Sequence, residues 1–199
     1  MTMAKLRLFG WFLGLGLLAF WSAGCPTATV GGSQNRTDNG STDDGSGNGT
    51  VGVEVGVEIT IPNEGAAHVP VGRQVTFQNN PPASGTHWSE SGVAPIAPGF
   101  YETAVEEEQW VHNLEHGDIV FLYDCNGPCP STLLGELQDF FDSTPPSEAS
   151  ATTRMVIAPY DGLPFLLTAI AWDRQLHLET FEAETLLDFY VRHVDQGPE

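Results

Sequence analysis

The residues best suited to do chemistry gather in the middle of the chain. They are histidines and cysteines, whose side chains bind transition metals: His68, His87, His112, His116, Cys125 and Cys129. Imidazole nitrogen and thiolate sulfur together favour copper or zinc. We therefore predict a metal site drawn from this set and assign no catalytic residue. The alternative is that each histidine hydrogen-bonds to backbone carbonyls in a polar core.

His112 and His116 also fit a motif of known chemistry. Residues 112–116, HNLEH, match the H-x-x-E-H signature of inverted zinc peptidases, in which both histidines hold zinc and the glutamate activates water. However, Gly117 and an apolar run follow at once, whereas that motif belongs inside a long helix. The domain is also small for such enzymes, and no downstream acidic residue stands out as a third ligand. A zinc hydrolase is thus the less favoured alternative, and the pattern favours binding over catalysis.

Residues 1–25 have the pattern of a lipoprotein signal peptide. A short basic region precedes an apolar run over 8–20, and small residues at 22–24 lead to Cys25. We predict cleavage before Cys25 and attachment of lipid, palmitate included, to this cysteine, which becomes the first residue of the mature protein. Ser22 stands where such signals usually carry Leu, and an uncleaved membrane anchor is the alternative. Either arrangement places the domain outside the cytoplasm, tethered to the membrane of a bacterial cell envelope.

Export would leave Cys125 and Cys129 in an oxidising compartment. Because Cys25 is assigned to the lipid, these are the two remaining cysteines, and a structural disulfide between them is at least as favoured as a pair of metal thiolates. The two hypotheses are compatible if the disulfide is reducible.

The composition limits the domain organisation and the partners. The chain has 199 residues, enough for one domain with appendages, and 26 acidic against 7 basic residues give a formal charge of -19. Nucleic acid is excluded as a partner, because phosphate binding needs clustered Lys and Arg. Residues 26–52 are mostly Gly, Ser, Thr, Asn and Asp, which predicts a disordered tether. The globular domain is assigned to 53–199.

Alternating or continuous apolar residues predict the strands of this domain. Valines and isoleucines alternate with polar residues over 53–61, the pattern of a half-buried strand. The run 119–123 is apolar throughout, which predicts a central strand buried on both faces. Further strands are expected at 75–77, 155–158 and 166–172.

Helices are expected on either side of the central strand and near the end of the chain. The acidic run 106–108 suits a helix start, and Gly117 suits its end. Pro130 opens a second helix, and Thr180 is expected to cap a third, with an apolar stripe of Ala183, Leu186, Leu187, Tyr190 and Val194. His177 and His193 are interpreted as surface or capping residues. The fold class is α/β or α+β: a single domain with a mixed sheet covered by two to three helices.

The loop 79–88, NNPPASGTHW, is expected to be rigid because two prolines lie within it. It could present His87 to a metal, or it could bind a protein partner in the envelope. Under that second hypothesis the protein is a non-catalytic interaction module, and exposure of Trp88, Trp110 or Phe100 would support it.

Several of these motifs occur together in one known family. HVP at 68–70, PPxSGxHW at 81–88, VHNLEHG at 111–117 and CxxxCP at 125–130 resemble the bacterial family catalogued as domain of unknown function 3105. The resemblance extends from about Val53 to the end of the chain. It implies an exported or membrane-tethered domain and no established activity.

A second resemblance is local. Residues 118–141, a strand followed by CxxxCP and a helix, are similar to the copper site of the thioredoxin-like Sco family. This similarity implies a thioredoxin-like local unit in which Cys125 and Cys129 are thiolate ligands and one upstream histidine completes the copper site. The histidine-rich part before this segment does not follow that family.

Overall fold

The computed structural model describes residues 55–199, which belong to one compact unit spanning 49–199. The predicted signal peptide, the lipidation of Cys25 and the tether at 26–52 lie outside the described residues, so these remain predictions.

A six-stranded sheet forms the centre of this unit, in the order β1-β8-β7-β5-β6-β4. Its strands are β1 (Glu58–Thr60), β4 (Gly99–Phe100), β5 (Ile119–Tyr123), β6 (Met155–Pro159), β7 (Leu167–Ala171) and β8 (Arg174–Leu178). The pairs β5–β6 and β4–β6 are parallel, whereas β5–β7, β7–β8 and β1–β8 are antiparallel. The sheet is therefore mixed, and the predicted α+β architecture is confirmed.

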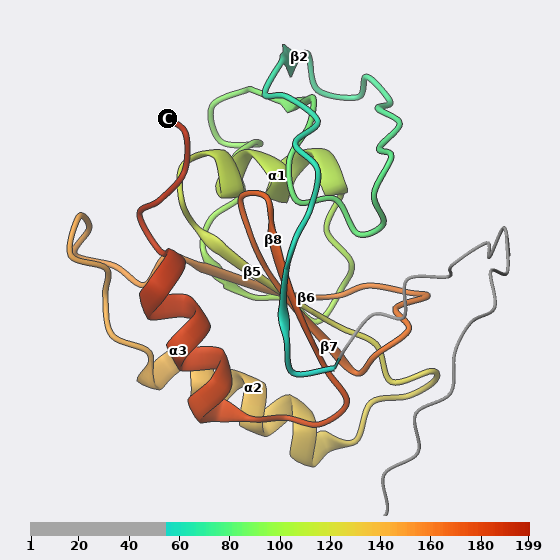
Figure 1. Cartoon of the computed structure of the whole chain (residues 1–199), viewed down its shortest axis with the longest axis vertical. Coiled ribbons are helices and arrows are strands. Elements are labelled where there is room, and N and C mark those ends of the chain that lie inside the picture. The colour runs from blue at the N-terminus through green and yellow to red at the C-terminus, as the bar shows by residue number, and fades with distance from the viewer. Residues whose placement is uncertain (1–54) are drawn as a thin grey trace, which may run out of the picture. The chain divides into compact units, whose positions relative to one another are not determined.

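Three helices cover the sheet: α1 (Glu107–Glu115), α2 (Ser131–Ser143) and α3 (Ala183–His193). In Figure 1, α2 and α3 lie together on one side of the strands, and α1 lies on the other side, toward β2 (His68–Val69). β2 pairs with β3 (His87–Trp88) in a separate two-stranded sheet. Within 55–199, no helix combines the length and the apolarity needed to cross a bilayer.

The central strand β5 is apolar throughout because both of its faces are covered. Phe121 packs into a core cluster shared with α2 and α3, where its ring meets Phe140 edge-on at 5.5 Å between centroids. Val120 and Leu122 pack on the other face, in a cluster that includes Trp110 of α1. Because successive side chains of a strand point to opposite faces of the sheet, the single apolar run of β5 contributes to two separate cores. One of these cores carries α1, which bears the candidate residue His112 and ends just before His116.

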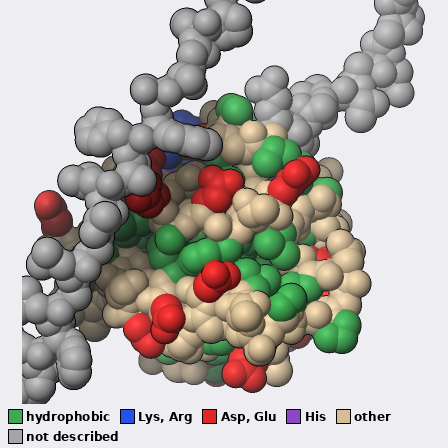
Figure 2. All heavy atoms as spheres, turned by 90° about the horizontal axis from the view of Figure 1, so that it is seen from below, with side chains coloured by type: hydrophobic (Ala, Val, Ile, Leu, Met, Phe, Trp, Pro, Cys, Tyr) green, Lys and Arg blue, Asp and Glu red, His purple; other side chains and the backbone are tan. Residues whose placement is uncertain are grey.

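The face of the molecule at the bottom of Figure 1 agrees with the acidic composition. Figure 2 shows hydrophobic side chains gathered in its middle, with Asp and Glu side chains scattered around them.

Two strand predictions were wrong or incomplete. The strand expected at 53–61 spans only Glu58–Thr60 among the described residues, because Gly56 turns the chain with φ +74° and leaves Val55 and Val57 exposed. Residues 75–77 form no strand. Four strands were not predicted: β2, β3, β4 and β8. β8 carries polar residues and therefore lacks an apolar run, yet it is held by the antiparallel β7–β8 pairing.

Three assignments near the C-terminus also needed correction. His177 lies in β8, is buried and shares a hydrogen bond with Thr168 at 3.1 Å, so it is not a surface residue. In α3 the inward side includes Phe189, which is fully buried, while Leu187 is exposed. Thr180 does not cap this helix; its hydroxyl donates to the side chain of Glu182, the residue at the N-cap position.

The buried position of Phe121 leads to a stability prediction. Replacing Phe121 with Ala should lower the free energy of unfolding by about 3–5 kcal/mol, because it leaves a cavity between β5 and α2. Val191→Ala is the control: Val191 is 59% exposed, and its loss should change stability by less than about 0.5 kcal/mol. Urea unfolding followed by circular dichroism measures both, and equal shifts in the two variants would contradict this description of the core.

Candidate metal centre

Helix α1 carries three site residues to one place. Glu115 and His116 lie three and four residues after His112, with His116 at the C-cap, so all three lie on one side of the helix end. The opposite side packs into the core through Trp110 and Leu114. The helix stops as predicted, since Gly117 adopts φ +85° just after the C-cap.

The paired strands β2 and β3 supply two more histidines. They run parallel with His68 directly opposite His87, and the His87 amide donates to the carbonyl of Ala67 at 3.0 Å. The preceding Gly85 has φ +131°, and a Cβ there would meet the ring of Phe77 at 2.9 Å. Only glycine therefore fits the turn that delivers His87.

These segments converge on one carboxylate. The Oε2 atom of Glu115 lies 2.9 Å from His68 Nε2, 3.0 Å from His87 Nε2 and 4.0 Å from His112 Nε2. One ligand atom from each of these four residues lies within 4.8 Å of the others. We call the group His68, His87, His112 and Glu115 the inner site. It is buried apart from His68, whose side chain is 43% exposed.

Backbone carbonyls orient two of the rings. The Nδ1 atom of His87 lies 2.8 Å from the carbonyl of Gly85, and that of His112 lies 2.7 Å from the carbonyl of Trp88. Because a carbonyl oxygen only accepts, each Nδ1 carries the proton. In the neutral ring, Nε2 then presents a lone pair to the inner site, which is the arrangement of metal-binding histidines.

This arrangement requires a positive charge inside the inner site. If His87 is neutral, its Nε2 lone pair faces the carboxylate oxygen of Glu115 at 3.0 Å. Two acceptors at that distance are held together only by a shared cation, either a proton or a metal ion. Burial raises the pKa of Glu115, but the hydrogen bonds and charges of His68 and His87 outweigh it, and the net direction is downward. The carboxylate is thus kept ionised and available as a ligand.

His112 is kept neutral by its surroundings. Burial lowers its pKa, the hydrogen bond to Trp88 partly opposes this, and the neighbouring histidines lower it further, to about 4. At neutral pH the ring is therefore uncharged and its Nε2 can bind a metal.

A second group shares His112. The Nε2 atom of His116 lies 3.1 Å from Nε2 of His112 and 3.7 Å from Oε2 of Glu199. We call His112, His116 and Glu199 the outer site; their ligand atoms also lie within 4.8 Å of one another. His116 thus lies beside the inner site and is not part of it.

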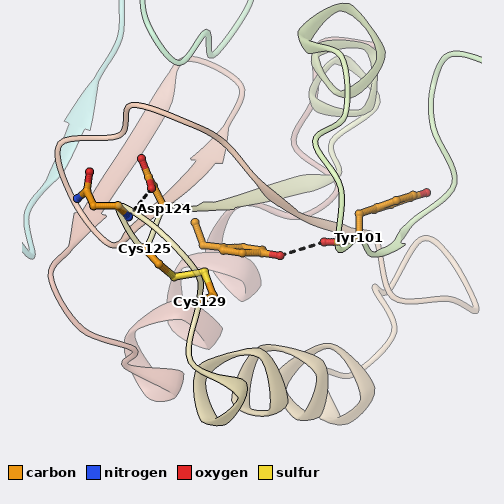
Figure 3. The surroundings of a disulfide bond; sticks show 6 residues. Tyr101, Asp124, Cys125 and Cys129 are labelled. Carbon is orange, nitrogen blue, oxygen red and sulfur yellow. Dashed lines mark hydrogen bonds between the residues drawn. A yellow bond between two sulfur atoms is a disulfide. The ribbon is translucent and has the colours of Figure 1, made fainter.

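The two cysteines are joined to each other and do not belong to the histidine cluster. Their sulfur atoms lie 2.00 Å apart, at disulfide-bonding distance. Figure 3 shows the bond between the end of β5 and the start of α2, beside Asp124. His112 and His116 precede β5 in the chain, and Cys125 and Cys129 follow it. In this oxidised form the sulfurs offer no thiolate, and neither cysteine falls in either candidate metal group found among the described residues.

Sequence reasoning missed both carboxylates as ligands. In the zinc peptidase pattern Glu115 would activate water, but here its oxygen contacts the two imidazoles of β2 and β3 directly. Its place in the VHNLEHG motif was the available signal. Nothing local marked Glu199, because its proximity to His116 arises from the path of the C-terminal segment.

The aromatic residues proposed for partner binding differ in their exposure. Trp110 is fully buried and cannot contact a partner. Trp88 and Phe100 are partly exposed, and Trp88 lines an open acidic cleft of about 690 Å³ that also includes Glu106, Glu107 and Asp161.

The lowered pKa of His112 leads to a pH prediction for the metal-free protein. The folded state resists protonation of His112, so stability should be complete above pH 6.5 and fall as the pH drops toward 4, by up to roughly 3 kcal/mol. His112→Asn, whose amide can still donate to Trp88, should show a shallower loss. Some pH dependence should remain, because burial also lowers the pKa of His177.

Urea midpoints measured at several pH values with a chelator present test this expectation. The same pH slope in the wild type and in His112→Asn would contradict it.

The comparisons with known proteins identify a family. The model of a family described as protein of unknown function, DUF3105, matches residues 68–199, which contain all three helices and every described strand except β1. No curated protein and no solved structure matches the chain. The match begins at His68 and includes every residue of the inner and outer sites. On this evidence the chain belongs to the DUF3105 family.

Proposed function

We propose that this protein binds one divalent transition metal ion, zinc or copper, in the inner site. The observation that carries the proposal is the orientation of the His87 and His112 rings: carbonyls hold their Nδ1 atoms, and their Nε2 atoms lie 3.0 Å and 4.0 Å from Oε2 of Glu115. Three imidazoles and one carboxylate are a ligand set suited to zinc(II) and copper(II). A bound ion would also supply the positive charge that the close approach of His87 to Glu115 demands.

The inner site contains no sulfur ligand, and this indicates which metal ion it would bind. Copper(I) prefers thiolate and thioether ligands, whereas imidazole and carboxylate suit divalent ions. With Cys125 and Cys129 in a disulfide and outside both candidate metal groups, a site of the Sco type would form only after reduction and a rearrangement that brings a histidine to the sulfurs. The nitrogen and oxygen donors therefore favour the divalent ions, and copper(II) should bind more tightly than zinc(II).

Binding is favoured over catalysis. Catalytic zinc keeps an open position for water, whereas structural sites are closed by four protein ligands. The inner site offers four, and Glu115 acts within it as a ligand rather than as a base directed at water. A role in holding, storing or passing on a metal ion therefore fits better than hydrolysis.

The predicted localisation completes the proposal. A disulfide persists in oxidising compartments, which supports export of the domain, and a lipid on Cys25 would tether it to the membrane of the cell envelope. We therefore propose an extracytoplasmic, lipid-anchored metal-binding protein.

Metal analysis of the tag-free protein tests the proposed binding. We expect one zinc(II) or copper(II) per chain, and metal at about 100 times its Kd should stabilise the fold by about 2.7 kcal/mol. His68→Ala should weaken binding by on the order of a hundredfold, because even partners outside the ligand shell change affinity 10–100-fold.

His68 suits this test because its side chain is 43% exposed and its removal leaves His87 paired with Glu115; circular dichroism of the metal-free variant checks that the fold is retained. His193→Ala, outside the site, is the matched control. Equal affinities in these two variants, or no bound metal in the wild type, would disprove the proposal.

The predicted localisation and the lipid on Cys25 are tested separately. Expressed in a bacterial host, the wild type should fractionate with membranes and its mature N-terminus should carry acyl chains on Cys25. Cys25→Ser should abolish the acylation, as mass spectrometry would show. Acylation that is absent from the wild type, or that persists in the variant, would contradict the lipoprotein assignment.

A further inference from the structure

The outer site is the part of this region that the proposed function leaves without a role. It consists of His112, His116 and Glu199, and it differs from the inner site chiefly in its access to solvent. The side chains of His116 and Glu199 are 36% and 55% exposed, whereas that of His112 is only 5% exposed. One buried imidazole therefore stands between a closed ligand set and an open one.

His112 can serve only one of the two sites at a time. Its Nδ1 atom is held by the carbonyl of Trp88, so Nε2 is the single nitrogen free to bind a metal. That atom lies 3.1 Å from Nε2 of His116 on one side and 4.0 Å from Oε2 of Glu115 on the other. Because one imidazole lone pair binds one ion, the inner and outer sites are alternative positions for a single metal.

The geometry of the two rings suits a transfer between these positions. The rings of His112 and His116 stack, with an angle of 19° between their planes and 4.8 Å between centroids, so their Nε2 atoms are adjacent. An ion at the outer site would already be bound to His112. It could then exchange its bonds to His116 and Glu199 for bonds to His68, His87 and Glu115 while keeping the bond to His112.

We infer that the outer site is a transfer position, through which a metal ion passes between solvent and the inner site. This inference rests on the proposed metal binding and adds the path by which the ion arrives and leaves. The inner site needs such a path because His87 is fully buried and Glu115 nearly so. His68 provides the competing path, since its side chain also reaches solvent.

The chain builds the outer site through specific contacts of its C-terminal segment. The amide of Glu199 donates to the carbonyl of Glu115 at 3.2 Å, and that of Asp195 donates to Gly117 at 2.9 Å. A Cβ on Gly197 would overlap the backbone of Glu115 and Gly117. The segment therefore lies directly against the end of α1 and brings the Glu199 carboxylate to His116.

Two partly buried ion pairs of Arg154 also hold this segment in place. Arg154 binds Asp118 at 2.6 Å and Asp195 at 2.8 Å, and it also donates to the carbonyl of His116. One guanidinium thus links Asp118 just before β5, the C-cap residue His116 and the C-terminal segment. Such a fixed arrangement gives the outer site defined geometry although its two outward ligands are exposed.

The experiment compares rates with equilibria in the full-length protein. Copper(II) loading is followed by stopped-flow quenching of tryptophan fluorescence, release is followed after adding excess chelator, and Kd is measured by competition. A residue used only in transfer changes both rates by the same factor and leaves the equilibrium unchanged. We therefore expect His116→Ala to slow loading and release on the order of tenfold each, with little change in Kd. Glu199→Gln should act in the same direction and less strongly.

Two further variants sharpen the comparison. His68→Ala, an inner-site change, should raise Kd, and His193→Ala should change neither rates nor Kd. Gly197→Ala, which displaces the segment carrying Glu199, should reproduce the slow exchange of the Glu199 variant without removing a ligand.

The outcomes separate this inference from the proposed function. If the wild type binds no copper or zinc, both are wrong. If it binds and His116→Ala exchanges metal as fast as the wild type, the ion uses the path beside His68 and the transfer position is disproved. If His116→Ala raises Kd as much as His68→Ala does, His116 is a ligand of the final site and the transfer role is again disproved.

Discussion

The site depends on one constraint, which is the burial of the Glu115 carboxylate among imidazoles. An ionised carboxylate taken out of water costs several kcal/mol unless it is paired. His68 and His87 supply that pairing from segments 47 and 28 positions away in the chain. Each of the strands β2 and β3 has only two residues, too few to be stable alone. The contact with Glu115 therefore works in both directions: the histidines compensate the carboxylate, and the carboxylate fixes the place of the loops that carry them.

The central strand β5 gives this contact a rigid base. α1 packs on one face of β5 through its apolar side, so that its polar side faces β2 and β3. α2 and α3 pack on the opposite face, and the disulfide joins the end of β5 to the start of α2. The histidine cluster and the disulfide are thus anchored to the same strand, but to opposite ends of it. This explains how histidines and cysteines close together in the sequence contribute to separate features of the structure.

If the proposed function holds, the inner and outer sites would divide the tasks of a metal-binding protein between them. A buried ligand set holds an ion firmly, because the ion has no competing water and each ring is oriented in advance by a carbonyl. The same burial would slow exchange, and an exposed imidazole next to a shared ligand would relieve that difficulty. The strongly acidic composition favours the approach of cations in general, whereas selection among them falls to the nitrogen donors. Retention and exchange can then coexist in one small domain.

The sequence by itself determined the features that depend on short-range pattern. The apolar run of β5, the stop at Gly117 and the helical spacing of His112 and His116 could be inferred because strand and helix periodicity and turn chemistry are local. His68 and His87 could be nominated by residue type and motif, but their meeting at Glu115 could not be inferred. Only the tertiary structure decided which groups converge: it included Glu115, placed Glu199 beside His116 and separated both cysteines from the histidines. These choices arise from the packing of segments distant in the chain, which leaves no periodic signal in the sequence.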